Sequence, residues 1–132
     1  MRYALVWLAL ISCRSEPKHA DARAIVRAYE DFQNAGPGDR PAALKALETV
    51  QCTPLTCTDR DHCSNYGRLL MRAQELARKA RELGPEDAGG NGAASESELA
   101  IIIGGADDAT KEATKAEPAC RAGIQRLYAL TR

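Results

Sequence analysis

The stretch from Thr58 to Leu83 constrains the fold of this chain more than any other part of its sequence. Apolar residues recur in it at intervals of three and four positions, which is the spacing of one face of an α-helix. Charged residues fill the opposite face, where Glu75 and Lys79 stand four positions apart and can stabilise a helix as an ion pair. The apolar set comprises Tyr66, Leu69, Leu70, Ala73, Leu76, Ala77, Ala80 and Leu83. Because a stripe of this length must be covered, the sequence predicts a long helix, capped by Thr58 and packed against further helices.

The rest of the chain has the composition of a helical protein. Alanine, the best helix former, accounts for 24 of 132 residues, and aromatic residues account for only 5%. A β-sandwich or barrel would need more β-branched and aromatic residues. Helical spacing and turn signals predict further helices over residues 19–34, 39–52 and 95–115 and from residue 118 onward. We therefore expect an all-α fold in a single domain, residues 19–132, built as a small bundle of four to five antiparallel helices and stapled by disulfides.

One segment leaves a choice between helix and strand. Three consecutive isoleucines, Ile101 to Ile103, precede the pair Gly104-Gly105, and a short apolar run of this kind suits either element. The sequence offers no partner strand for it. We therefore expect this segment to be helical.

The N-terminal residues have the pattern of an export signal. After Arg2, nine apolar residues run from Tyr3 to Ile11. This run is too short to span a membrane, which takes about 20 residues, but it fits the apolar region of a secretory signal peptide. The sequence Leu10-Ile11-Ser12-Cys13 at its end resembles the lipobox of bacterial lipoproteins.

This resemblance implies that the Cys13 thiol carries acyl chains such as palmitate and that the chain is cut just before it. Residues 1–12 are then a lipoprotein signal peptide, and residues 13–18 are a short polar tether. The resemblance also implies a place in the bacterial cell envelope. The residue after the cysteine is Arg14, whereas lipoproteins retained in the inner membrane often have Asp at that position. The resemblance therefore favours the outer membrane, facing the periplasm. The alternatives are an ordinary secretory signal with an incidental cysteine and an N-terminal core helix.

If Cys13 is acylated, four cysteines remain, and an even number in an exported chain indicates disulfides. Four cysteines allow three sets of pairs. We expect Cys63–Cys120, joining the starts of two helices, and Cys52–Cys57, across the turn at Pro54. The alternative set is Cys52–Cys63 with Cys57–Cys120. In a bundle of antiparallel helices all four cysteines meet at one end, which we call the cysteine pole.

The same end of the bundle holds weaker candidates for chemistry. A zinc site could use His62 with three of the cysteines, but their C-x4-C-x5-C spacing is not that of a standard zinc knuckle, and an oxidising compartment favours disulfides. An acid–base group could combine His62 with Asp59, Asp61 and Tyr66. No recognisable nucleophile frame, haem-attachment motif or phosphate loop accompanies them. We therefore expect neither an enzyme nor a metal or cofactor site.

The charges indicate what kind of partner the chain could bind. Lys and Arg number 18, as do Asp and Glu, and no basic block of the kind that binds nucleic acid is present. The distribution is uneven, because residues 60–83 carry six basic and three acidic side chains, whereas residues 85–117 carry two basic and eight acidic ones. Such segregation usually reflects solvated faces that attract one another within a bundle. The functional alternative is an acidic surface around Asp107, Asp108 and Glu112 that binds a basic partner.

These patterns predict a lipid-anchored interaction module of the cell envelope. Its role would be that of an adaptor, a complex subunit or an inhibitor. We expect its partner to be another envelope protein and not a nucleic acid. The alternative function is a small metal- or ligand-binding protein, or an enzyme, centred on the cysteine pole and His62.

Overall fold

The computed structural model describes residues 19–83 and 96–132, and these residues form helices without any strand. The helices are α1 (Ala20–Asn34), α2 (Arg40–Thr49), α3 (Cys57–Glu82) and α4 (Glu96–Thr131). The expected all-α fold is confirmed, and the three isoleucines lie within α4. The predicted signal peptide, Cys13, the tether and the loop before α4 lie outside the described residues.

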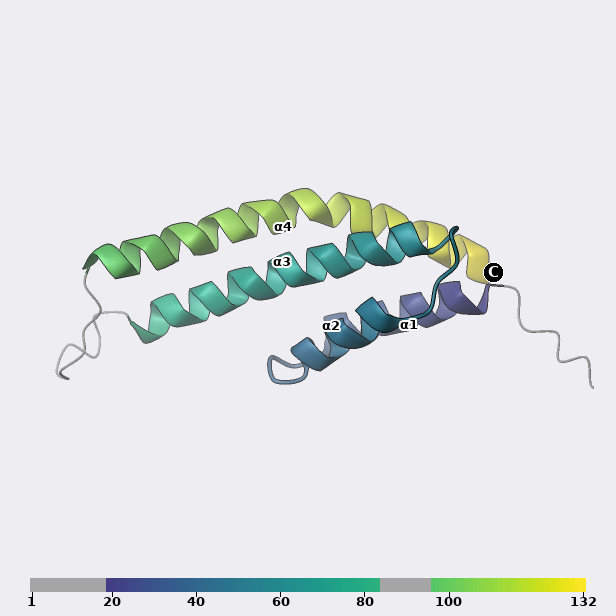
Figure 1. Ribbon diagram of the computed structural model, residues 1–132, viewed down its shortest axis with the longest axis horizontal. Coiled ribbons are helices and arrows are strands. Elements are labelled where there is room, and N and C mark those ends of the chain that lie inside the picture. Colours follow the sequence, from purple (N-terminus) through teal and green to yellow (C-terminus); the bar gives the residue numbers. More distant parts are fainter. Residues whose placement is uncertain (1–18, 84–95) are drawn as a thin grey trace, which may run out of the picture.

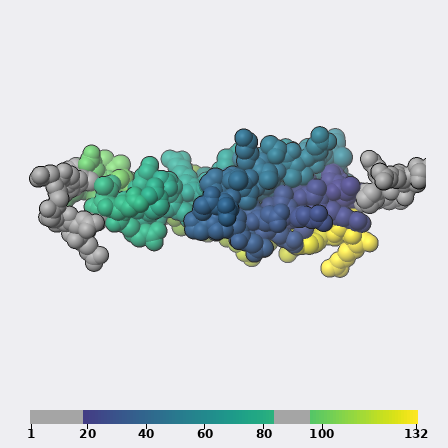
Figure 2. Space-filling model, turned by 90° about the horizontal axis from the view of Figure 1, so that it is seen from below, coloured from purple at the N-terminus to yellow at the C-terminus, as the bar shows by residue number. Residues whose placement is uncertain are grey.

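Two helical hairpins of unequal length make up the fold (Figure 1). Helices α3 and α4 form the long antiparallel hairpin, and the shorter hairpin of α1 and α2 packs against one half of it. The start of α1, the loop 50–56, the first turns of α3 and the last turns of α4 lie together at one end, which is the cysteine pole. At the other end α3 and α4 extend beyond the short hairpin (Figures 1 and 2), and we call residues 75–83 and 96–108 the distal arm.

Local signals set most helix ends where the sequence predicts them. The Gly-Pro-Gly turn ends α1, and the Gly36 carbonyl accepts hydrogen bonds from the backbone N–H groups of Asp39 and Arg40. Asp39 is the N-cap of α2, with proline in the first turn. Helix α2 ends at Thr49, three residues earlier than expected, and Thr56 rather than Thr58 is the N-cap of α3.

The prediction that Pro118 opens a separate helix is wrong. Helix α4 runs from Glu96 to Thr131 with Pro118 inside it. Proline lacks the N–H that would bond to the carbonyl of Thr114, and its ring crowds that carbonyl. Packing overrides this local cost, because α4 is fixed against α3 by a disulfide at Cys120, directly after the proline turn. Figure 1 shows α4 bent along its length, as expected of a helix that contains a proline.

The core is concentrated in the half of the molecule nearer the cysteine pole. Ile25, Phe32, Leu47 and Leu127 are the largest fully buried apolar side chains. Gly67 of α3 lets the short hairpin approach, since a Cβ there would lie 2.7 Å from Cδ1 of Leu44. Farther along the long hairpin the buried residues are alanines, namely Ala73, Ala109 and Ala113. Within the described residues, no helix combines the length and apolar character needed to cross a membrane.

Candidate functional site

The cysteine pole holds both disulfides, Cys52–Cys57 and Cys63–Cys120, and they are the favoured pairs. Cys63 and Cys120 are fully buried, and their Cα atoms lie 4.4 Å apart. The expected reason for this pair was wrong in one respect, because Cys120 lies well inside α4 and not at the start of a helix. Antiparallel packing of two long helices, not the meeting of two helix starts, brings Cys120 to Cys63.

The loop 50–56 is tied to the first turn of α1 by hydrogen bonds that sequence reasoning missed. One carboxylate oxygen of Asp21 accepts a bond of 2.5 Å from the Thr56 hydroxyl and one of 3.0 Å from the Thr53 hydroxyl. The Thr53 backbone N–H donates to the same oxygen. The Thr56 bond is the largest cause that lowers the pKa of Asp21 below its ordinary value, and the Thr53 bonds act in the same direction. The available signal was two threonines flanking a proline turn, which are typical side-chain donors in loops.

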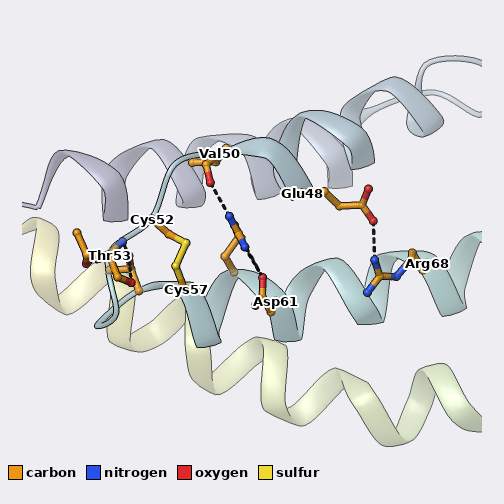
Figure 3. A network of polar contacts seen from close by, with 9 residues as sticks. Glu48, Val50, Cys52, Thr53, Cys57, Asp61 and Arg68 are labelled. Carbon is orange, nitrogen blue, oxygen red and sulfur yellow. Dashed lines mark hydrogen bonds and ion pairs between the residues drawn. A yellow bond between two sulfur atoms is a disulfide. The ribbon is translucent and has the colours of Figure 1, made fainter.

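A second set of contacts holds the other side of this loop (Figure 3). The Arg60 guanidinium donates to the Val50 carbonyl at 2.8 Å and forms an ion pair with Asp61 at 2.7 Å. Two turns of α3 farther on, Arg68 pairs with Glu48 of α2. The loop between α2 and α3 is therefore held by a disulfide, by α1 and by α3 at once.

The acidic residues next to His62 have other partners. Asp59 is buried and accepts a hydrogen bond of 2.5 Å from Arg126 of α4, while Asp61 pairs with Arg60. His62 is exposed, and among the described residues it forms no hydrogen bond or ion pair with either carboxylate. The structure thus gives each member of the hypothetical acid–base group a separate environment. Among residues 19–83 and 96–132, no three His, Cys, Asp or Glu side chains are placed to hold a metal ion.

The three residues of the predicted acidic surface do not all lie on one face of α4. Asp107, Asp108 and Glu112 are all exposed on α4. Asp108 and Glu112 stand four positions apart and therefore share a face, whereas Asp107 points to a neighbouring one. Lys111 lies 3.8 Å from Asp108 and offsets part of the negative charge. Ile101, two turns before Asp108, is on the same side of α4 and is 74% exposed.

A shallow groove runs between α3 and α4 where the short hairpin ends. Its volume is about 230 Å³. Arg40 at the start of α2 marks its edge, donating to the Gln74 side chain at 2.6 Å. Burial against this region raises the pKa of Tyr66. The lining comprises Tyr66, Leu70, Ala73, Gln74, Ala77, Thr110, Ala113, Thr114 and Glu117.

Beyond the groove, the distal arm exposes large apolar side chains. Ile101, Ile103 and Leu83 are the most accessible of them, and Figure 2 shows the arm extending past the short hairpin.

Comparison with known proteins gives no match, since no family model, curated protein or solved structure is significantly similar to the chain. What the chain does must therefore be inferred from its own residues.

Proposed function

We propose that this chain is a lipid-anchored protein of the bacterial cell envelope that binds another envelope macromolecule through its distal arm. The observation that carries the binding role is the distal arm, where, within the described residues, α3 and α4 pack only on each other and present Ile101, Ile103 and Leu83 to solvent. Leu83 is the C-cap of α3, and Ile101 and Ile103 lie on different sides of α4, so both helices of the arm expose large apolar side chains, as interaction sites often do. The role is that of an adaptor, a complex subunit or an inhibitor.

The anchor is supported by the sequence at Leu10 to Cys13 and by the apolar run before it. Each buried CH₂ of an acyl chain contributes about 0.8 kcal/mol, and two chains hold a protein stably at a bilayer. A lipid on Cys13 would keep the protein at the membrane without any spanning helix. Arg14 after the cysteine favours the outer membrane, facing the periplasm.

The partner that best fits the arm has an apolar centre and a basic rim. Ile101 supplies an apolar contact, and Asp108 and Glu112 at the base of the arm supply negative charge on the same side of α4. Complementary charge speeds association and fixes register, while the apolar contact supplies affinity.

Site-specific crosslinking in the native envelope tests the binding role. A photoreactive residue replaces Ile101 on the arm or, as the control, Ala24, which is exposed on α1. We expect one partner to be captured at position 101 and not at position 24, as identified by mass spectrometry. Equal capture at both positions, or none at position 101, would contradict the proposal.

Charge reversal adds a second, independent readout. The double variant Asp108→Lys, Glu112→Lys should reduce capture at position 101 several-fold, because it turns attraction into repulsion. The control, Asp31→Lys, reverses an exposed charge on α1 and should leave capture unchanged. Loss of capture in both variants would indicate general destabilisation instead of a binding surface.

A further inference from the structure

A large apolar side chain is exposed at the cysteine pole. Leu55, in the loop between Cys52 and Cys57, is 62% exposed, and only Ile101 is more exposed among the large apolar residues that the structure describes. Its neighbour Thr56 is fully buried. The loop therefore turns its polar threonine inward and its leucine outward, the reverse of what burial alone would favour.

The loop that presents Leu55 is restrained on several sides. The Cys52–Cys57 disulfide closes it, and the bonds from Thr53 and Thr56 to Asp21 fasten it to α1. Restraint of this kind removes conformational freedom before any partner arrives, which lowers the entropic cost of a contact. An exposed leucine on a restrained loop can therefore contact an apolar surface with little further loss of conformational entropy.

The position of the loop relative to the chain start identifies that surface. Asp21, to which the loop is fastened, lies in the first turn of α1. Only residues 14–18 separate Cys13 from the first described residue, His19, and at 3.3–3.6 Å per residue this stretch spans at most about 20 Å. A lipid on Cys13 would therefore hold the cysteine pole within about 20 Å of the bilayer.

We propose that the loop between Cys52 and Cys57 rests on the bilayer and inserts Leu55 among the lipid headgroups and upper acyl chains. The inference depends on the proposed lipid anchor at Cys13. One leucine buries too little surface to bind a membrane alone, but the anchor makes the contact intramolecular, so a weak contact suffices to orient the protein. The cysteine pole then faces the membrane, and the distal arm, at the opposite end of the long axis (Figure 1), points away from it.

Tryptophan fluorescence tests this orientation directly. The only tryptophan of the chain is Trp7, which lies in the predicted signal peptide, so a mature chain beginning at Cys13 would contain none. Two single-tryptophan variants, Leu55→Trp and Ile101→Trp, replace exposed residues at opposite ends of the molecule. Each acylated protein is reconstituted into vesicles of phosphatidylethanolamine and phosphatidylglycerol, with and without brominated acyl chains.

We expect the emission of Trp at position 55 to shift to shorter wavelength and to be quenched several-fold by brominated lipid. The emission of Trp at position 101 should change little. Equal weak quenching at both positions, in protein that floats with the vesicles, would overturn the loop contact and leave the anchor intact. Protein that carries no acyl chain and does not float would overturn the anchor and the loop contact together. Circular dichroism and an intact Cys63–Cys120 disulfide confirm that each variant is folded.

Discussion

At the scale of single residues, Gly67 is the described glycine at which an added side chain would meet the closest contact. A Cβ at this position would lie 2.7 Å from Cδ1 of Leu44 and 3.2 Å from Cζ of Phe32. We expect Gly67→Ala to lower the free energy of unfolding by about 1–3 kcal/mol, because the overpacked core must shift. Gly104→Ala is the matched control, since a Cβ there meets nothing within 4 Å and should stabilise the helix by about 0.5–1 kcal/mol. Urea unfolding measures the free energy of unfolding of both variants. Equal changes in the two would contradict the close approach of Leu44 and Phe32 to Gly67.

A second prediction at this scale concerns pH. Hydrogen bonds from Thr56 and Thr53 lower the pKa of Asp21 below 3.8, so the folded state favours the charged carboxylate. The stability that results is present above the ordinary pKa and is lost as the pH falls through the lowered one. We expect the difference in free energy of unfolding between the wild type and Asp21→Asn to narrow as the pH is lowered below 3.8. When Thr56 is replaced by valine in both proteins, this pH dependence should weaken. A difference in free energy of unfolding that stays constant with pH would contradict the role of these hydrogen bonds.

At the scale of elements, the two disulfides should contribute unequally. Cys63 and Cys120 are 57 positions apart and Cys52 and Cys57 only 5, and the entropy that a crosslink removes from the unfolded chain grows with loop length. We expect the paired substitution of Cys63 and Cys120 by alanine to lower the free energy of unfolding by about 4 kcal/mol, and that of Cys52 and Cys57 by about 2 kcal/mol. Chemical denaturation of the two variants compares them. A larger loss for the short loop would show that strain or packing, not chain entropy, governs their effects.

The elements also show how far sequence reasoning reaches. The long helix and the glycine turn follow from local periodicity and turn chemistry. The even number of cysteines indicates disulfides but leaves their pairing open, and the preference for Cys63–Cys120 rests on a helix start at Pro118 that the structure does not have. The continuity of α4 through Pro118 does not follow from local patterns, because the local signal at proline indicates a helix start, and only packing against α3 outweighs it. The hydrogen bonds to Asp21 and the pair Asp59–Arg126 join positions far apart in the chain, and no local pattern specifies such contacts. The predicted acidic surface does not lie on a single face of α4, because the helical repeat directs Asp107 away from Asp108 and Glu112.

At the scale of the whole molecule, the two ends of the protein would have different roles. Helix α4 has 36 residues, which at 1.5 Å per residue is a length of about 54 Å. The cysteine pole, with its disulfides and Leu55, would lie at the membrane. Counted along α4 from its end at the pole, Ile101 would lie about 45 Å away and the acidic pair Asp108 and Glu112 about 30–35 Å away. With a hairpin of this length, a chain held by a short tether could reach a partner well beyond the lipid headgroups.

The central claim is the lipid anchor at Cys13, because both the orientation and the reach of the arm depend on it. Intact-mass spectrometry tests it most directly, on the full chain expressed in a bacterium and purified from its membranes, with Cys13→Ser as the control. We predict a chain that begins at Cys13 and carries the added mass of acyl chains on that residue, whereas the Cys13→Ser protein carries none. A mature chain that begins at another residue, or an unmodified Cys13, would contradict the account.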